Sequence, residues 1–506
     1  MIKILSNDQI RAADKATMEK EGIDSLTLME RAAGQCTGWI LGHVQEGVGF
    51  LIVCGQGNNG GDGLAIARML WQKGKIVRVV VIKDTGNPSP GFNINLKNWE
   101  SLTGEIVKAI DSPLEITPPE PTDIIVDAIF GSGLNRRPEG TAAETIKWLN
   151  NTTNRILSID LPSGLFGDRD TGHTEVVIRA FATLSFQAPR PAFLYPEYAD
   201  FLGDWQILDI GLDTDFLKDA PAYGFMTEGT DIAQLLLPRP AFGHKGTFGH
   251  ALILAGSYGK AGAAILAAEA CLRSGAGLVT VRTPSACVVP LQSAVPEAMV
   301  SVDPEDHYLG ENLKADTPFT AIGMGPGIGT GQQTGNVLKR IIQDFDAPMV
   351  LDADALNLLS SNPTWLSFLP SGTVLTPHLG EFARLAGKIR DPFERTLKQT
   401  ELAKRYNCFI ILKGKFTCIA CPDGQLFFNS TGNQGMAKGG TGDVLTGLIT
   451  GLLAQGMAPM KAALAGTYLH GLAGDLAAIQ LHPASMTSRD LIDYFSMAFN
   501  EVSTLK

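Results

Sequence analysis

A glycine-rich turn with a single acid precedes a long apolar segment near the C-terminal end of the chain. It reads AKGGTGDVLTGLITGLLAQG, from Ala437 to Gly456. The apolar segment has the length of a helix, and the free N–H groups at a helix start favour an anion such as phosphate. A carboxylate at Asp443 would repel that anion. An acid at this position is therefore costly unless it takes part in the chemistry of the site. A plain helix N-cap is the alternative, although a cap does not require four neighbouring glycines.

A second group of polar residues follows three expected strands in the first half. Such strand ends carry more polar side chains than helix caps alone would need. Because ligands of open parallel sheets bind at the carboxyl ends of strands, we expect the three loops to converge on one site. The loops are NNGGDG with Asn58, Asn59 and Asp62, DAIFGSGLNRR with Asp127, Arg136 and Arg137, and DLPSG with Asp160 and Ser163.

The residue types in these loops predict two kinds of chemistry. Asn59, Asp127 and Ser163 offer only oxygen atoms, which suit an alkali or alkaline-earth ion better than zinc. Asp160 is the candidate acid or base for a bound substrate.

The strand FLIVC is also followed by a GxGxxG pattern, formed by Gly55, Gly57 and Gly60. This pattern keeps a nicotinamide dehydrogenase open as an alternative for the first half. Such an enzyme would need an acid at the end of the next strand, where the sequence offers Lys83 and then Asp84. A non-catalytic nucleotide-binding or scaffolding module is a further alternative.

Two series of short apolar runs must position these residues. Helix-length segments separate the runs, which predicts parallel sheets covered on both faces and an α/β fold with two domains. The first 45 residues are expected to be helical, CIACPDGQLFF to form a hairpin, and 212–227 to join the domains. The expected strands are 50–54, 76–82, 123–130, 155–162 and 182–186 in the first series, and 250–256, 278–283, 319–325, 349–354, 374–378 and 409–414 in the second.

Bulk properties exclude several classes of protein. The chain has 506 residues, a formal net charge of −11 and no long basic run, which argues against nucleic acid or an anionic membrane as partner. No segment reads as a secretory signal or a bilayer span. Seven scattered cysteines, including one CxxC at Cys418 and Cys421, indicate reduced thiols in a cytoplasm rather than a metal site.

The motifs of the first half resemble those of the NAD(P)H-hydrate epimerase domain, the YjeF N-terminal domain. NNGGDG, DAIFGSGL and DLPSG occur in the same order and spacing, and the domain is expected over 1–222. The resemblance implies a Rossmann-like α/β/α sandwich, and potassium bound by Asn59, Asp127 and Ser163. It implies that the hydrated nicotinamide nucleotide contacts Asp160 and two runs, namely Asn58, Asn59, Gly60, Gly61 and Asp62, and Gly131, Ser132, Gly133, Leu134, Asn135, Arg136 and Arg137.

The second half resembles the ADP/ATP-dependent NAD(P)H-hydrate dehydratase domain, a ribokinase-like α/β domain expected over 226–506. The motifs are GHKGTFGHALILAGS, GMGPGIG, DADALN, LTPHLGEF and NQGMAKGGTGDVLTG. The turn GGTGD resembles the anion-binding signature of the ribokinase-like superfamily, which implies that Asp443 is a general base taking a proton from a substrate hydroxyl that meets a phosphoryl group. The resemblance implies substrate contacts at Ala264, Gly327, His378 and Asp443, with a one-residue shift open at Ala264. It implies that the adenine nucleotide contacts Lys413, Gly414, Lys415, Phe416, Thr417 and Gly442.

Together the two resemblances imply a bifunctional repair enzyme. One half would interconvert the R and S forms of hydrated NADH and NADPH (NADHX and NADPHX). The other would dehydrate the S form with ADP or ATP and Mg²⁺. We expect a cytoplasmic homo-oligomer. Because the ribokinase-like superfamily shares GGTGD, a kinase for a vitamin precursor or sugar remains an alternative for the second half.

Overall fold

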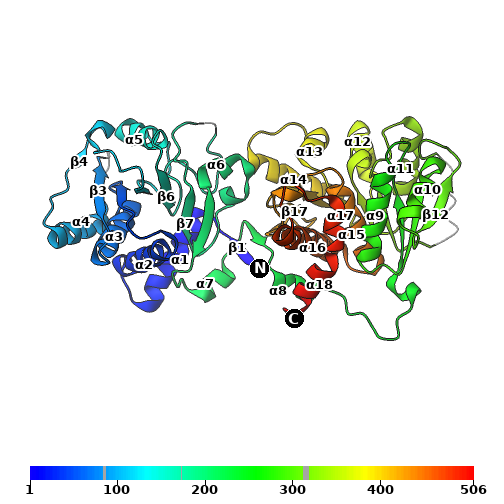
Figure 1. Ribbon diagram of the computed structural model, residues 1–506, viewed down its shortest axis with the longest axis horizontal. Helices are drawn as coiled ribbons and strands as arrows, with labels where there is room; N and C mark the ends of the chain where they lie inside the picture. The colour runs from blue at the N-terminus through cyan, green and yellow to red at the C-terminus, as the bar shows by residue number, and fades with distance from the viewer. Residues whose placement is uncertain (84–86, 173, 311–317) are drawn as a thin grey trace. The chain divides into compact units, whose positions relative to one another are not determined.

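The protein is described by a computed structural model that covers residues 1–83, 87–172, 174–310 and 318–506 (Figure 1). It divides into two compact units. The N-terminal unit is Lys3–Tyr223, and the C-terminal unit is Gly224–Lys506 together with Met1–Ile2. The division falls inside the expected joint at 212–227, whereas the placement of Met1–Ile2 has no signal in the sequence.

The N-terminal unit contains a seven-stranded sheet in which every neighbouring pair is parallel. The strand order reverses between β2 and β5, and such a switch point is where open α/β sheets bind ligands. Across the sheet the strands are β4 (Ala109–Ile110), β3 (Val77–Ile82), β2 (Phe50–Cys54), β5 (Ile124–Ala128), β6 (Arg155–Ile159), β7 (Ala182–Phe186) and β8 (Asp204–Leu208).

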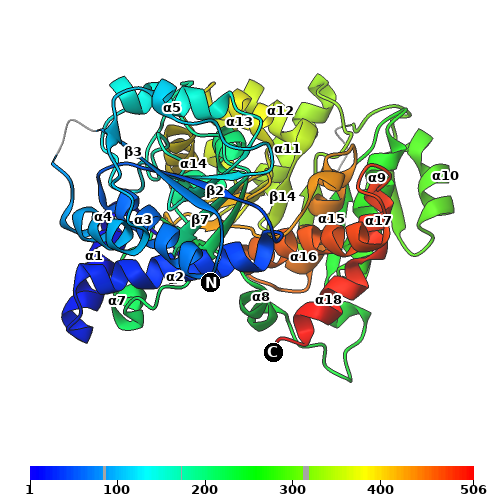
Figure 2. The same cartoon turned by 60° about the vertical axis from the view of Figure 1, so that its left-hand side comes forward.

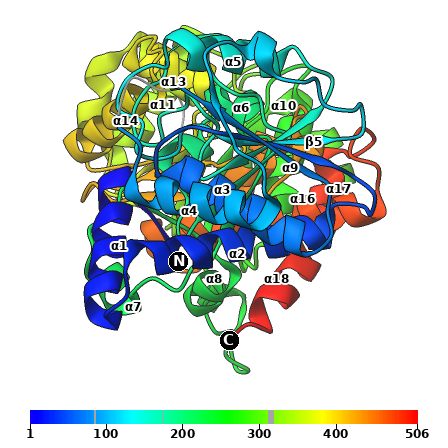
Figure 3. The ribbon, with the colours of Figure 1, turned by 90° about the vertical axis from the view of Figure 1, so that its left-hand side faces the viewer.

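Both faces of this sheet are covered, as the uninterrupted apolar runs predict. In β2, Ile52 packs into the core on one face while Leu51 and Val53 pack into the core on the other. Helices α2, α3 and α4 pack side by side on the first core (Figure 3), and α5 packs on the second. The helices are α1 (Asn7–Glu21), α2 (Ser25–His43), α3 (Asn58–Gln72), α4 (Pro90–Thr103), α5 (Gly140–Asn150), α6 (Ala199–Leu202) and α7 (Thr214–Asp219).

The main sheet of the C-terminal unit is parallel from β16 to β12 and ends in an antiparallel arm, β16–β17–β18. Its order reverses at β13 and β10, which creates a second switch point. Across the sheet, from β9 onward, the strands are β9 (Gly224–Met226), β18 (Leu426–Phe428), β17 (Cys418–Ala420), β16 (Phe409–Leu412), β15 (Val374–Leu375), β14 (Met349–Leu351), β13 (Ala321–Met324), β10 (His250–Leu254), β11 (Leu278–Pro284) and β12 (Met299–Asp303). The short strand β1 is Ile2–Ile4.

Helices α9, α15 and α16 pack together against one face of this sheet (Figure 2). The strand residues that alternate with those of this core, such as Leu252 and Met324, are equally buried, so the other face is covered too. The helices are α8 (Gly229–Leu235), α9 (Ala261–Arg273), α10 (Ser285–Ala294), α11 (Gln332–Asp344), α12 (Ala353–Ser361), α13 (Leu379–Ala386), α14 (Pro392–Tyr406), α15 (Thr441–Ala454), α16 (Pro459–Gln480), α17 (Ser488–Asp493) and α18 (Phe495–Ser503).

The architecture confirms the expected fold class, a Rossmann-like α/β/α unit followed by a ribokinase-like α/β unit. The expected strands are all present. Most of them end earlier than expected, because the residues at their carboxyl ends belong to the loops of the two sites. Cys418 and Cys421 lie in the antiparallel arm as buried free thiols. Within the described ranges, no helix has the length and apolar character needed to cross a bilayer. Asp84, the acid considered for a dehydrogenase, lies outside the described residues.

Candidate functional site

The first site lies at the switch point between β2 and β5, where close backbone contacts require glycine. A Cβ on Gly60 would lie 1.7 Å from the carbonyl oxygen of Gly55, and a Cβ on Gly63 would lie 2.5 Å from the Cβ of Ala128. Helix α3 therefore starts directly against the strand ends. The GxGxxG pattern reflects this close packing, which is a structural requirement independent of any dinucleotide.

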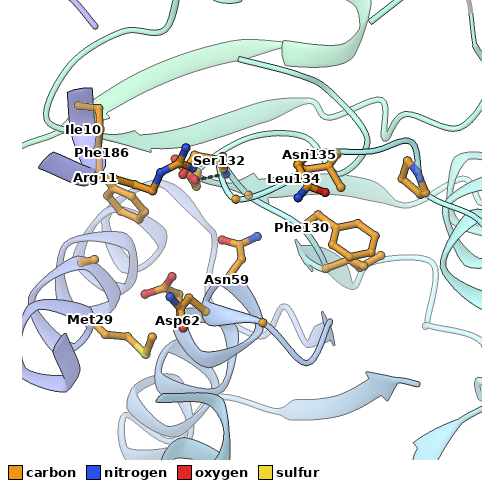
Figure 4. A pocket seen from close by; sticks show the side chains of 18 of the residues that line it. Ile10, Arg11, Met29, Asn59, Asp62, Phe130, Ser132, Leu134, Asn135 and Phe186 are labelled. Carbon is orange, nitrogen blue, oxygen red and sulfur yellow. Dashed lines mark hydrogen bonds between the residues drawn. The ribbon is translucent and has the colours of Figure 1, made fainter. Parts of the chain in front are cut away.

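The structure brings the three predicted loops together around Gly131. A Cβ at this position would lie 2.6 Å from Asp160 Oδ2 and 3.1 Å from Asn59 Oδ1. The backbone N–H of Ser132 donates a hydrogen bond of 2.6 Å to Asp160 Oδ2 (Figure 4). The loops after β2, β5 and β6 thus meet at one point, as expected for strand ends of a parallel sheet.

Asp160 is held in a conformation that non-glycine residues rarely adopt. Its φ is 64°, in the left-handed region, which costs on the order of 1–3 kcal/mol for a non-glycine residue. Its second oxygen, Oδ1, lies 3.4 Å from Nη2 of Arg190, whose side chain is 1% exposed. The carboxylate is therefore fixed by an N–H donor on one side and a buried guanidinium on the other.

Asp127, at the end of β5, is fully buried and accepts several hydrogen bonds. The donors are the backbone N–H of Ser163 at 2.9 Å, the hydroxyl of Ser158 at 2.8 Å, and the hydroxyl of Ser163. Burial raises the pKa of Asp127, and these hydrogen bonds partly oppose that rise. Asn59, beside Gly131, is 9% exposed, and its amide oxygen and nitrogen both lack hydrogen-bond partners among the described residues.

A cavity of about 900 Å³ opens over these loops. It is lined by Asn58, Asn59 and Asp62, by the whole run from Gly131 to Arg137, and by Asp160. Asp127 and Ser163 lie beneath this lining (0% exposed), and Gly60 and Gly61 form the tightly packed start of α3. Figure 4 shows Asn59, Asp62 and Ser132 lying around the cavity.

The second site lies where α15 begins. Gly440 precedes the helix with a φ of 95°, a left-handed conformation that glycine adopts without strain. Asp443 lies in the first turn, and its carboxyl forms no hydrogen bond or ion pair with another described residue. Burial, followed by the negative charge of Asp352, raises the pKa of Asp443 to about 7. This value suits a general base near neutral pH.

A buried ion pair supports the turn. Lys413 Nζ, after β16, lies 2.8 Å from Oδ1 of Asp352, whose side chain is almost fully buried at the end of β14. The hydroxyl of Thr446, one turn further along α15, donates to Asp352 Oδ2 at 2.9 Å. A Cβ on Gly442 would lie 3.4 Å from both Lys413 Nζ and Asp352 Oδ2. Three strand and helix ends therefore position the ammonium group of Lys413 beside the start of α15.

The predicted histidine belongs to the same cluster. His378 follows β15, and its backbone pairs with that of Lys413. Its ring caps α13 by accepting the N–H of Gly380 at Nδ1, and its Nε2 lies 3.4 Å from Oε1 of the buried Glu381. The other carboxyl oxygen of Glu381 lies 4.0 Å from Lys413 Nζ. His378 is thus a helix cap, and its half-exposed ring lies next to the ion pair of the site.

At the second switch point, the glycine turn after β13 approaches the start of α9. Gly327 has a φ of 64°, and its carbonyl accepts a hydrogen bond of 2.7 Å from the hydroxyl of Ser257. A Cβ on Gly327 would lie 3.0 Å from the Cβ of Ala263, which is partly exposed. Ala264 is fully buried against Gly256. Of the two alanines, Ala263 is the one that the structure places at the surface of the site.

The predicted nucleotide loop runs from Lys413 to Thr417. The hydroxyl of Thr417 donates to the carbonyl of Gly414 at 2.9 Å, which closes the loop on itself. Lys415 Nζ donates to the carbonyl of Gly432 at 2.5 Å and lies 5.8 Å from the ring centre of Phe416. Lys413, paired with Asp352, and Lys415 therefore both have partners already. A bound phosphate would compete with these partners for the lysines or bind beside them.

Comparison with known proteins finds matches in both units of the chain. A family model described as NAD(P)H-hydrate dehydratase matches residues 251–496, and one described as YjeF-related protein N-terminus matches residues 25–192. The bifunctional NAD(P)H-hydrate repair enzyme Nnr of Moorella thermoacetica is 35% identical over 95% of this chain and 93% of its own. The chain belongs to the family of bifunctional NAD(P)H-hydrate repair enzymes.

Other relatives in the family match to a similar extent. The Nnr enzyme of Escherichia coli is 35% identical over 99% of this chain and 94% of its own length. A crystal structure of the ADP/ATP-dependent NAD(P)H-hydrate dehydratase of Bacillus subtilis, co-crystallised with ATP and Mg²⁺, shares 31% identity. It covers 55% of this chain and 99% of its own, with a TM-score of 0.49.

Several residues that line the YjeF-type cavity were not predicted from the sequence. They come from α1, α2, the end of β7, and the segments that follow β7 and β8. The guanidinium of Arg11 donates to the carbonyl of Ser132 at 3.2 Å. One signal was available, because Ile10, Asp14 and Met18 are spaced four apart and so share a helix face. An acid between two apolar residues on one face is unusual. The unpredicted lining residues include Ile10, Arg11, Asp14, Met18, Ser25, Leu28, Met29, Ala32, Phe186, Arg190 and Ile210.

Proposed function

We propose that this chain repairs hydrated NADH and NADPH in two steps. The N-terminal unit interconverts the R and S epimers of the hydrate. The C-terminal unit dehydrates the S epimer at the expense of ADP or ATP. One observation carries the proposal most directly: an unpaired carboxyl, Asp443, at the glycine-rich start of α15, next to the Lys413–Asp352 pair. A base and a cation around a phosphate-binding turn are the parts that phosphoryl transfer to a hydroxyl needs.

In the dehydratase, Asp443 takes the proton of the 6-hydroxyl as its oxygen attacks the terminal phosphoryl group. The nucleotide product, which has lost its terminal phosphoryl group, is then released. The ring nitrogen then expels phosphate, a better leaving group than hydroxide, and the neighbouring ring carbon loses a proton to restore the dihydropyridine. His378, Gly327 and the first turns of α9 at Ala263 or Ala264 would contact the substrate.

The nucleotide would lie over the loop Lys413–Thr417 and the first turn of α15 at Gly442. Lys413 supplies a positive charge there and the glycine turn supplies N–H groups, which together favour phosphate oxygens. Mg²⁺ would enter as part of the nucleotide co-substrate, since this ion is commonly bound by phosphates and few protein ligands.

In the epimerase, the proposed substrate residues are Asp160 and those of the three loops around the cavity. Asn59, Asp127 and Ser163 fit potassium on structural grounds. A buried amide oxygen without a partner and a buried carboxylate with a raised pKa both favour a nearby cation, and the donor set is all oxygen. When bound, the ion supplies positive charge at the floor of the cavity, where Asn59, Asp127 and Ser163 would hold it.

One assay tests the proposal as a whole. The full chain is given a mixture of R and S hydrates of known ratio, with ADP, ATP or no nucleotide, and formation of NAD(P)H is followed by absorbance. We expect complete conversion with one nucleotide at least, and none without. Conversion that stops at the initial S fraction would contradict epimerisation, and a stable phosphorylated product would indicate a kinase instead.

A cytoplasmic location, inferred from the scattered free cysteines, and a homo-oligomeric state remain predictions from the sequence. Size measured in solution by light scattering tests the second.

A further inference from the structure

Four carboxyl-bearing residues line the cavity of the N-terminal unit; Glu139 is exposed, whereas Asp14, Asp62 and Asp160 are at least partly buried and are held in different ways. Asp160 is paired with the N–H of Ser132 and with Arg190. Asp14, in the middle of α1, and Asp62, in the second turn of α3, also line the cavity. Neither forms a hydrogen bond or an ion pair with another residue in the described part of the chain. Asp14 and Asp62 are therefore partly buried acids that line the substrate space with no structural partner.

Asp14 lies outside the segment that the family model matches, which begins at residue 25. The structure nevertheless builds α1 into the site. Arg11, one turn before Asp14, donates to the carbonyl of Ser132, and Ile10 and Met18 line the cavity on the same helix face. Figure 4 shows Ile10 and Arg11 beside the cavity. Helix α1 is thus one wall of the substrate cavity.

The surroundings give the carboxyl groups of Asp14 and Asp62 different pKa values. Burial, followed by the charge of Asp160, raises the pKa of Asp14 to about 6, while Arg190 opposes the rise. Burial raises the pKa of Asp62 well above its usual range, and the charges of Asp160 and Asp14 add to this. The titratable and charged groups that line the cavity or act on this pair are Arg11, Cys36, Lys83, Arg136, Arg137, Glu139, Asp160 and Arg190.

Near neutral pH, one of these groups can accept a proton while the other holds one. Neighbouring titratable groups whose environments push their pKa values apart are a common arrangement for an acid and a base. The fixed carboxylate of Asp160, satisfied on both oxygens, is better suited to orient a substrate group than to exchange protons.

We propose that Asp14 and Asp62 are the acid–base pair of the epimerase site, with Asp14 the base and Asp62 the acid. This inference rests on the proposed epimerase function. Asp14 takes the proton of the 6-hydroxyl, the C6–O bond becomes a carbonyl, and the bond between C6 and the ring nitrogen breaks. Asp62 gives its proton to that nitrogen. After rotation about the C5–C6 bond, closure on the opposite face reverses both proton transfers and gives the other epimer, with no change in oxidation state.

The test uses the full chain without nucleotide, so that the dehydratase is idle, and follows exchange between R and S hydrates by chromatography. The uncatalysed exchange is subtracted. For the wild type we expect a rate that rises with pH through about 6, because Asp14 must be ionised to act. Asp14→Asn should lower the rate by about 10²- to 10⁴-fold and abolish that rise. Asp14→Glu should retain part of both.

Glu19→Gln is the matched control, because it removes one carboxylate from the exposed side of the same helix. It should leave exchange unchanged. Thermal unfolding followed by circular dichroism, measured on each variant, reports that the N-terminal unit is folded, and dehydration of the pure S hydrate reports the same for the C-terminal unit. A wild type that does not accelerate exchange overturns the proposed epimerase itself. A wild type that does, with Asp14→Asn matching it in rate and pH profile, overturns only the role of Asp14.

Discussion

The two acids predicted to be catalytic, Asp160 and Asp443, differ in what surrounds them. Asp160 is strained at φ 64° and held by Arg190, so the fold fixes its position. Asp443 has no such partner, and burial raises its pKa to about 7. A strained, paired carboxylate suits positioning, whereas an unpaired one with a raised pKa suits proton transfer. Residue type alone did not distinguish the two roles.

Asp443→Asn should reduce dehydration of the S hydrate by about 10²- to 10⁴-fold, because the base is lost while the turn remains. In the wild type the rate should rise with pH through about 7, since the deprotonated carboxyl is the acting form. Initial rates at saturating nucleotide between pH 5.5 and 8.5 measure both effects.

The thermal unfolding temperature of Asp443→Asn should not fall, because the change removes a partly buried charge without a partner. Epimer exchange in the same protein is the internal control and should be unaffected. Near-normal dehydration by this variant would remove Asp443 from the mechanism.

At the scale of elements, the glycines of α15 serve two purposes. Those before the helix form the turn that we propose binds phosphate, whereas Gly447 and Gly451 inside it allow α9 to approach. A Cβ on Gly447 would lie 2.1 Å from the carbonyl oxygen of Ala267, and one on Gly451 would lie 1.9 Å from the hydroxyl of Ser274. The same contact holds the first turns of α9 and α15, which carry the site, in a fixed relation.

Gly447→Ala should destabilise the C-terminal unit by about 1–3 kcal/mol, because the new methyl group meets backbone that cannot move aside freely. Chemical denaturation followed by loss of dehydratase activity measures this. Gly335→Ala is the matched control within the interior of α11, where a Cβ would have only ordinary contacts, the nearest at 3.5 Å. It should be neutral or stabilising by about 0.5–1 kcal/mol, since alanine favours a helix more than glycine does. Equal effects of both changes would contradict the packing argument.

At the scale of the whole molecule, two sites of different chemistry share one chain, each at the switch point of its own sheet. Proposed potassium ligands are present only in the N-terminal unit, and the unpaired amide of Asn59 belongs to them. Replacing potassium by a larger organic cation should therefore abolish epimer exchange and leave dehydration of the S hydrate intact.

Asn59→Ala should raise the potassium concentration for half-maximal exchange by about 10-fold or more, an effect that even outer partners of metal ligands commonly have. The side chain makes no hydrogen bond within the described structure, so the fold should tolerate its loss. Exchange that is independent of potassium in both proteins would refute the ion site, and a parallel loss of dehydration would show that the effect is not confined to the epimerase.

Much of this organisation could be predicted from sequence because it depends on local rules. Apolar runs of strand length alternate with helical segments, so eleven strands and the antiparallel arm at Cys418–Phe428 could be predicted. The strands β1, β4, β8, β9 and β12 were not predicted. Acids beside glycine turns located Asp127 and Asp160 at strand ends, because parallel strands place their carboxyl ends at one edge of a sheet. Asp443 was located by a glycine turn before an apolar helix.

Only the tertiary structure decided which distant groups meet and how burial alters them. Helix α1 closes the first cavity with Arg11 and Asp14, and Asp352 pairs with Lys413 across two strand ends. These contacts depend on packing between segments far apart in the chain, and the pKa of a carboxyl depends on the solvent and charge that such packing leaves around it. The sequence determined that acids follow glycine turns in each of two α/β units, and the fold determined which of these acids are buried and which are paired.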